Sequence, residues 1–159
     1  MPELPEVETI RRELEREIGG LRIKDVEVFD NRSIRRHPKK AGFIKPQEGA
    51  KVTSVHRRGK YLVLNLDTGS VLVIHLGMSG QLRRNQAKDE KETHTRVIWT
   101  FTQKGQLRFI DPRKFGEAFV VAADALDDEV PELAHLGFDP VEQQVSWTTF
   151  GQALIGRSV

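Results

Sequence analysis

The sequence predicts a mainly β domain with flanking helices, built as a sandwich or barrel behind one N-terminal helix. An amphipathic run opens the chain, and a series of short β-like runs separated by turn signals follows it. A length of 159 residues suits one domain, which we place over residues 1–159. We divide it into a helix over 5–19, a β-sandwich over about 21–121, and a connection with a short helix over about 124–157.

The N-terminal helix is predicted by apolar spacing and by its end signals. Pro5 fits a first turn, where its missing N–H would have had no partner. Gly19 and Gly20 are typical of a helix end. The apolar positions recur at spacings of three and four, as one helical face requires: Val7, Ile10, Leu14 and Ile18.

Seven strands are expected in the middle of the chain. They are Arg22–Phe29, Val52–His56, Tyr61–Leu66, Val71–Leu76, Arg96–Phe101, Gln106–Phe109 and Ala118–Val121. Residues 67–70 and 103–105 carry hairpin-turn signals. The charged segment 83–95 is expected to be a long surface loop.

The last segment is expected to be mostly connection. Pro131 and Pro140 interrupt residues 124–144, and Ser146 is a suitable N-cap for a helix over about 147–155. A helix with apolar residues at the very end of the chain has little to pack against. We therefore expect a domain cut from a longer protein.

Composition narrows the function classes. The chain has 25 basic and 23 acidic residues, a net charge of +2, which does not by itself imply nucleic acid. With no cysteine, a disulfide scaffold, a thiolate zinc site and a cysteine nucleophile are excluded. No apolar run is long enough to span a membrane, and the start is acidic rather than signal-like. We expect a cytoplasmic protein.

The N-terminus offers an amine and two carboxylates. Removal of Met1 would leave Pro2 with a free secondary amine, whose attack on a sugar carbon gives a positively charged iminium that favours elimination. Glu3 and Glu6 lie close enough in sequence to share acid and base roles. The alternative is that both carboxylates only complement the helix dipole.

Three turns offer further candidates. Lys60 lies in a basic hairpin turn (57–61) that could contact phosphates, or that could simply be a solvated, sheet-protecting hairpin. Met78 and Phe115 sit on glycine-bounded turns, as wedges into a base stack would, although core packing is the usual fate of such residues. Arg113, beside Phe115, could equally be a structural ion-pair partner.

Two other features carry less chemistry. The five histidines have no metal-ligand spacing, so no metal is expected. The basic run Arg32–Lys40 is expected to be a solvated loop.

Five segments in order resemble the bacterial formamidopyrimidine-DNA glycosylase family. They are PELPEVET (2–9), RRGKYL (57–62), HLGMSGQLR (75–83), DPRKFG (111–116) and HLGFDP (135–140). The resemblance implies an N-terminal helix and a two-layered antiparallel β-sandwich with DNA across one face. It also implies base-excision repair by a bifunctional glycosylase and AP lyase that removes oxidised purines, 8-oxoguanine and formamidopyrimidines, rather than oxidised pyrimidines.

By that resemblance, Pro2 is the nucleophile that forms a Schiff base at C1′, Glu3 assists sugar opening, and Glu6 positions the reacting groups. Lys60 assists at the lesion and in β-elimination. The resemblance also implies that Met78, Arg113 and Phe115 fill the gap left by the flipped base, and that Arg113 reads the opposite cytosine. It implies contacts with the DNA backbone for His75, His94 and Arg157.

We expect this chain to be the N-terminal domain alone, without the family's helix-two-turns-helix domain and zinc finger. No cofactor is therefore expected in this chain, since the zinc ion would belong to the missing finger. The expected partner is double-stranded DNA with oxidised bases, the expected location is the bacterial cytoplasm at the nucleoid, and a monomer is expected. Two alternatives stay open. One is a damaged-DNA-binding module without turnover, either truncated or naturally short, which the state of the N-terminus (free Pro2 or retained Met1) would distinguish from the enzyme. The other is a β-sandwich unrelated to DNA.

Overall fold

The computed structural model describes residues 4–126, which form two four-stranded antiparallel sheets packed as a sandwich. Its eight strands within this range are β1 (Ile23–Val28), β2 (Val52–Arg58), β3 (Tyr61–Leu66), β4 (Ser70–His75), β5 (Gln81–Asn85), β6 (Thr95–Phe101), β7 (Gln106–Ile110) and β8 (Glu117–Ala122). The predicted fold class is confirmed. The expected connection and helix beyond residue 126 lie outside the described residues.

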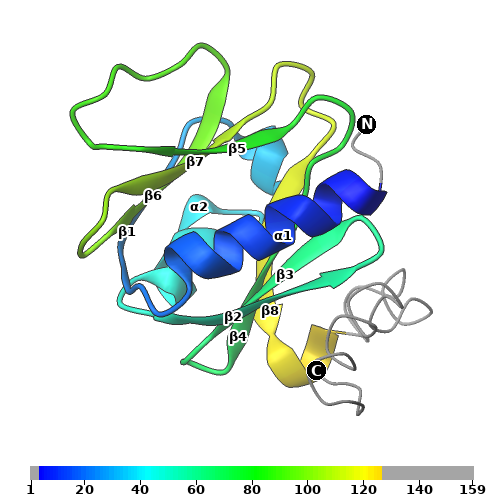
Figure 1. Cartoon of the computed structure of the whole chain (residues 1–159), viewed down its shortest axis with the longest axis vertical. Coiled ribbons are helices and arrows are strands. Elements are labelled where there is room, and N and C mark those ends of the chain that lie inside the picture. Colours follow the sequence, from blue (N-terminus) through cyan, green and yellow to red (C-terminus); the bar gives the residue numbers. More distant parts are fainter. Residues whose placement is uncertain (1–3, 127–159) are drawn as a thin grey trace.

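Helix α1 (Leu4–Ile18) lies across the sandwich and packs on β2 (Figure 1). Its expected apolar face is confirmed: Val7, Leu14 and Ile18 are buried, and Ile10 packs against the core. The helix ends as expected from its glycines, because Gly20 adopts a left-handed φ of 85° that residues with a side chain rarely adopt.

The two sheets differ in how their strands are connected. One has the order β2-β3-β4-β8, in which the first three strands form a local meander. The other has the order β1-β6-β7-β5, so β1 pairs with a strand far along the chain, with Val26 opposite Trp99. Alternate side chains of both sheets fill the space between them, and Trp99, Phe109 and Leu64 are almost fully buried there.

The segment between β1 and β2 is helical. It forms η1 (Asn31–Ile34), α2 (Lys40–Ile44) and η2 (Lys45–Gln47). Buried Gln47 accepts a hydrogen bond from the Trp99 indole N–H at 2.7 Å, which joins this segment to the core. The expected solvated loop over Arg32–Lys40 is correct only in part: residues 35–39 are non-helical and mostly exposed, but residues 32–34 belong to η1 and Lys40 begins α2. Arg35 and Arg36 also bind residues far along the chain.

A second correction concerns residues 83–95, expected as a loop. Residues 83–85 belong to strand β5, and Thr95 begins β6. Strand β5 has the sequence QLRRN, which lacks the apolar pattern of a strand, so its pairing with β7 could not be predicted. It lies at the edge of its sheet, where charged side chains discourage pairing with another chain. No helix within residues 4–126 is long and apolar enough to cross a membrane.

Candidate functional site

Two glycine-bounded turns pack directly against each other at one end of the sandwich. The β4–β5 turn (76–80) and the β7–β8 loop (111–116) approach so closely that a Cβ on Gly77 would lie 2.5 Å from the Gly116 nitrogen. Buried Asp111 joins them: its carboxylate accepts hydrogen bonds from the Ser79 hydroxyl at 2.7 Å and from the Gly116 N–H at 2.8 Å. One carboxylate therefore fixes both turns as a unit.

This unit exposes large side chains that sequence alone left ambiguous. Met78 is 51% exposed and Phe115 is 43% exposed, so neither is a core residue. Arg113 is exposed and its guanidinium lies over the Phe115 ring, 5.2 Å from the ring centroid. Two apolar side chains and a cation thus project together from rigid turns, as a wedge into a base stack requires. We call Met78, Arg113 and Phe115 the wedge.

His75 lies at the end of β4, directly before the wedge. Burial lowers the pKa of its imidazole, and the positive charges of Arg35 and Lys60 lower it further, against the opposing effect of Glu117. Its Nδ1 accepts a hydrogen bond from the Gly77 N–H at 3.1 Å, which places the proton of the neutral ring on Nε2. His75 is therefore a neutral N–H donor suited to a phosphate oxygen.

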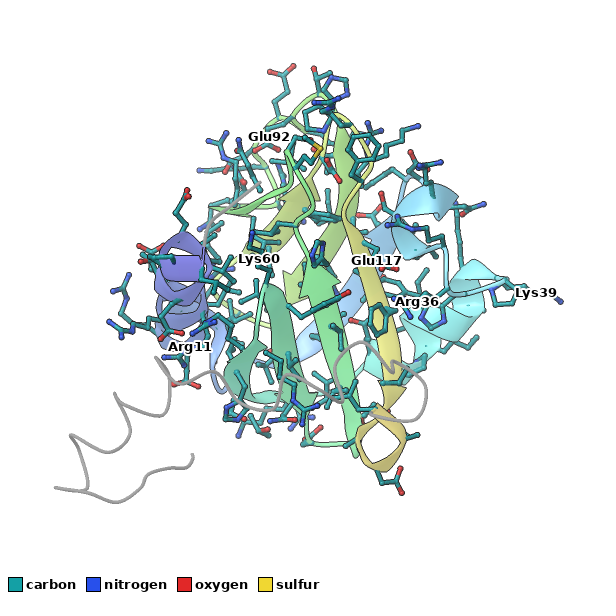
Figure 2. The ribbon with its side chains drawn as sticks, turned by 90° about the vertical axis from the view of Figure 1, so that its right-hand side faces the viewer. Arg11, Arg36, Lys39, Lys60, Glu92 and Glu117 are labelled. Atoms are coloured by element: carbon teal, nitrogen blue, oxygen red, sulfur yellow. The ribbon has the colours of Figure 1, made fainter. Side chains whose placement is uncertain are left out.

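Lys60 sits in the two-residue turn between β2 and β3, as the sequence indicated. Gly59, with a φ of 58°, allows this tight connection. The neighbouring Tyr61 pairs with His75 across the sheet, and their rings lie 4.7 Å apart. His75 pairs in turn with Glu117, so the Lys60 turn lies at the sheet end from which the β4–β5 turn and the β7–β8 loop emerge. Figure 2 shows Lys60 and Glu117 beside this sheet.

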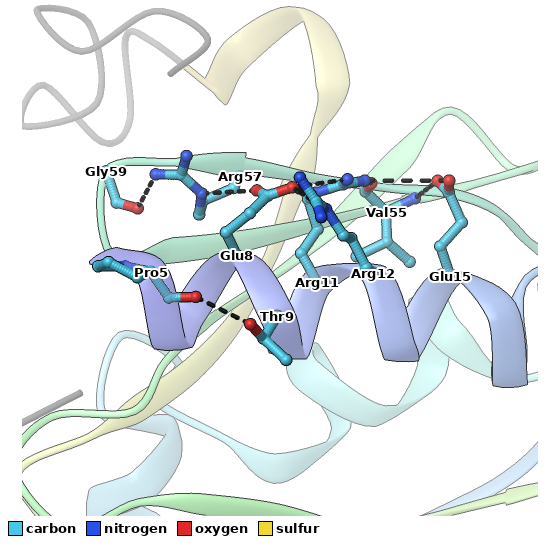
Figure 3. Close-up of polar contacts among 9 residues, drawn as sticks. All are labelled: Pro5, Glu8, Thr9, Arg11, Arg12, Glu15, Val55, Arg57 and Gly59. Carbon is cyan, nitrogen blue, oxygen red and sulfur yellow. Dashed lines mark hydrogen bonds and ion pairs between the residues drawn. The ribbon is translucent and has the colours of Figure 1, made fainter. Parts of the chain in front are cut away.

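A buried ion-pair network connects helix α1 to this turn (Figure 3). The Glu8 carboxylate accepts hydrogen bonds from Arg11, Arg12 and Arg57, the last at 2.9 Å. The fully buried Arg57 guanidinium also donates to the Gly59 carbonyl at 3.1 Å. Burial raises the pKa of Glu8, but the hydrogen bonds from Arg11 and Arg57 outweigh burial and hold that pKa below 4.5.

Through this network the first turn of α1, with exposed Glu6, lies near the hairpin of Lys60. His94 reaches the same end from the other sheet. It has a left-handed φ of 69°, its carbonyl accepts from the Asp111 N–H at 3.0 Å, and its ring lies 3.3 Å from the Arg96 guanidinium.

The structure therefore gathers seven of the sequence-predicted residues at one end of the molecule: Glu6, Lys60, His75, Met78, His94, Arg113 and Phe115. Pro2, Glu3 and Arg157 lie outside the described residues. Sequence analysis missed Arg32, Arg35 and Arg96, whose side chains bind the backbone of the β7–β8 loop. Arg32 and Arg35 are 80–82 positions from the carbonyl oxygens they bind in that loop, so no local pattern could indicate them.

Residues 1–118 match the family model of the formamidopyrimidine-DNA glycosylase N-terminal domain. The chain belongs to the formamidopyrimidine-DNA glycosylase family. A relative of that name from Salinispora arenicola is 46% identical over 160 residues, which cover 99% of this chain and 55% of the relative. Another from Pelotomaculum thermopropionicum is 42% identical over 143 residues, covering 90% of this chain and 51% of that protein.

Solved structures of formamidopyrimidine-DNA glycosylase from Lactococcus lactis share this fold. One, bound non-covalently to DNA with an abasic site, has a TM-score of 0.75 and 33% identity, and covers 82% of this chain and 49% of that chain. Another, in complex with DNA containing a formamidopyrimidine lesion, has the same TM-score and identity and covers 48% of that chain. The chain spans about half the length of the formamidopyrimidine-DNA glycosylases it matches.

Proposed function

We propose that this chain is the catalytic domain of a base-excision repair enzyme, a DNA glycosylase and AP lyase acting on oxidised purines in double-stranded DNA. The observation that carries the proposal is the wedge: three solvent-facing side chains held on two turns that share the Asp111 carboxylate. A base must leave the stack before its glycosidic bond can be attacked, and such side chains offset the cost of a few kcal/mol by filling the gap. Family membership and the lesion-bearing DNA in the related Lactococcus lactis structures support the same substrate class.

In the proposed reaction, the Pro2 amine attacks C1′ of the damaged nucleotide while Glu3 protonates the opening sugar. The base leaves, and the resulting iminium carries a positive charge that favours loss of the C2′ proton and elimination of the 3′ phosphate. Glu6, in the first turn of α1, positions these groups, and Lys60 stabilises the lesion phosphate and assists elimination. The groups proposed for this chemistry are an amine, two carboxylates and a lysine of this chain, with no cofactor.

The remaining residues hold the DNA. His75 adjoins the β4–β5 turn and His94 adjoins the β7–β8 loop, and both are proposed to donate to backbone phosphates, with Arg157 proposed for a further backbone contact. Arg113 is proposed to read the cytosine left opposite the flipped base, since an arginine offers several donors in a fixed geometry.

The first test is borohydride trapping on an oxoguanine:cytosine duplex, read by intact-protein mass. Protein lacking Met1 is expected to gain the mass of the DNA strand, whereas protein that retains Met1 should form no adduct because its Pro2 nitrogen is an amide. An adduct on Met1-bearing protein would contradict the proline mechanism. No adduct on Met1-free protein that still binds the duplex would instead identify a DNA-binding module without turnover.

Lys60→Gln tests the hairpin lysine in the same assay. We expect the rate of adduct formation to fall about 10- to 100-fold, in the range of a lost proton-transfer or electrostatic contact. Lys39→Gln is the matched control, because Lys39 is an exposed lysine that projects away from the site in Figure 2. Equal rates for the two variants would remove Lys60 from the proposed machinery.

A further inference from the structure

The β7–β8 loop, residues 111–116, has nearly all of its backbone carbonyls bound by arginine side chains. Arg96 donates to the carbonyls of Asp111 at 2.9 Å and Pro112 at 3.4 Å. Arg32 donates to Lys114 at 3.2 Å.

Arg35 binds two loop carbonyls, as many as Arg96 does, and also binds the backbone of Arg32. Its two terminal nitrogens donate to the carbonyls of Gly116 at 2.8 Å and Phe115 at 3.1 Å, and one of them also donates to the Arg32 carbonyl at 3.0 Å. A planar guanidinium is the side chain best suited to bind neighbouring oxygens at a fixed spacing. Arg35 therefore holds both the loop and its neighbour Arg32.

The loop needs such support because its backbone is strained. Lys114 has a φ of 61°, the left-handed region that side-chain-bearing residues rarely adopt. This conformation costs of order 1 kcal/mol or more and persists only where surroundings hold it. Asp30 adds a further restraint, since its carboxylate lies 2.7 Å from the Lys114 ammonium.

We propose that Arg35, with Arg32 and Arg96, acts as a brace that holds the loop in its final shape before DNA arrives, so that Arg113 and Phe115 enter the base stack without rearranging. The brace arginines are positioning residues, because they bind loop carbonyls rather than bases. A preformed loop avoids the ordering cost of binding. The expected effect on DNA rests on the proposed function, whereas the brace itself can be tested on the free protein alone.

Hydrogen–deuterium exchange of the free protein tests the brace without DNA. In Arg35→Gln, the Gly116 amide is expected to exchange about tenfold faster, the effect of losing charge-assisted hydrogen bonds that close the loop. Arg35→Lys should behave nearly like Arg35→Gln, because an ammonium cannot reproduce the planar fork. Unchanged exchange in Arg35→Gln would overturn the proposal.

The matched control is Arg84→Gln. Arg84 binds the carbonyls of Lys104 and Gln106 at the β6–β7 turn, where Lys104 also has a left-handed φ, 63°. It is the same kind of brace on a different turn. Its loss should speed exchange at that turn only and leave the Gly116 amide as it is in the unmodified protein.

The consequence for DNA is tested by borohydride trapping on an abasic site in a duplex and on the same site in single-stranded DNA. Only the duplex has a gap for the wedge to fill, so the ratio of duplex to single-strand rates should fall about tenfold in both Arg35 variants and stay constant in Arg84→Gln. Equal slowing on both DNAs would show a general structural defect and overturn the positioning role.

Two further outcomes separate the rival explanations. If Arg35 bound a phosphate directly, Arg35→Lys would keep the duplex rate and Arg35→Gln would lower the salt slope of binding by about one; that result would overturn the brace. If the unmodified protein formed no adduct on either DNA, the proposed function would fail, while the exchange measurement would still decide whether the brace exists.

Discussion

At His75, the surroundings select both a protonation state and a tautomer. Burial and two nearby cations keep the ring neutral, and the Gly77 N–H occupies Nδ1. Nε2–H is left as the donor. The lowered pKa is not readable from the sequence around His75, because the cations come from Lys60 and Arg35 on other segments, whereas the tautomer is set locally by Gly77.

We therefore expect nitrogen-detected NMR to show His75 as the Nε2–H tautomer, with a pKa below 6.5. Folding favours the neutral ring, so the unfolded chain takes up this proton first as pH falls below 6.5, and the contribution of His75 to stability is lost there. Above pH 6.5 that contribution is constant. A His75→Gln variant identifies the signal, and an Nδ1–H tautomer would refute the assignment.

Among the elements, helix α1 depends on charge as well as on its apolar face. Val7, Leu14 and Ile18 supply the burial that the sequence pattern predicted. The same pattern gave no sign that Glu8 and Arg11 are also buried, because their partner Arg57 lies 49 positions from Glu8. Periodicity reports which face is apolar, but not which charged residues are paired beneath it.

Glu8→Gln should destabilise the protein by about 3–5 kcal/mol at pH 7, because Arg11 and Arg57 would keep buried charges without a carboxylate. The pKa of Glu8 is lowered by folding, so its contribution is complete above pH 4.5 and is lost as pH falls through the lower folded value. Chemical denaturation at several pH values should show the difference between the two proteins shrinking below pH 4.5. A difference independent of pH would contradict the role of the Glu8 charge.

Some strands could be predicted from their own sequence, whereas others depend on pairing with distant residues. Seven expected strands are present because alternating or continuous apolar runs mark them. Strand β5 was missed since its character comes from pairing with β7, and η1 and α2 were missed because their short helices lack a full apolar period. The wedge turns were found from their glycines, whereas the braces that hold them were not.

At the scale of the whole molecule, Phe109 and Phe115, six positions apart, have opposite environments. Phe109 is fully buried between the sheets, whereas Phe115 is 43% exposed on the wedge. Burial thus assigns Phe109 to stability, whereas the exposed Phe115 is available for the role on DNA that we propose. The packed sandwich supports the exposed side chains at its end, and these side chains do not contribute to the core.

Phe109→Ala is expected to lower the free energy of unfolding by about 3–5 kcal/mol through the cavity it leaves. Phe115→Ala should change stability by less than about 0.5 kcal/mol but slow adduct formation on duplex DNA about tenfold or more. Thermal unfolding and borohydride trapping measure the two effects on the same samples. If Phe115→Ala destabilised the protein as much as Phe109→Ala, the separation of wedge from core would be wrong.

The pairing of β1 with β6 also sets an order of events during synthesis. Strands β2, β3 and β4 can form their meander as soon as they leave the ribosome, since each pairs with its neighbour. Strand β1 emerges before all of them, yet its partner, β6, ends only at Phe101. Such distant pairing is slow because a long loop must close first. The nascent chain therefore carries β1 without its sheet partner until Phe101 has been made, and an unpaired strand edge is a surface to which a chaperone can bind.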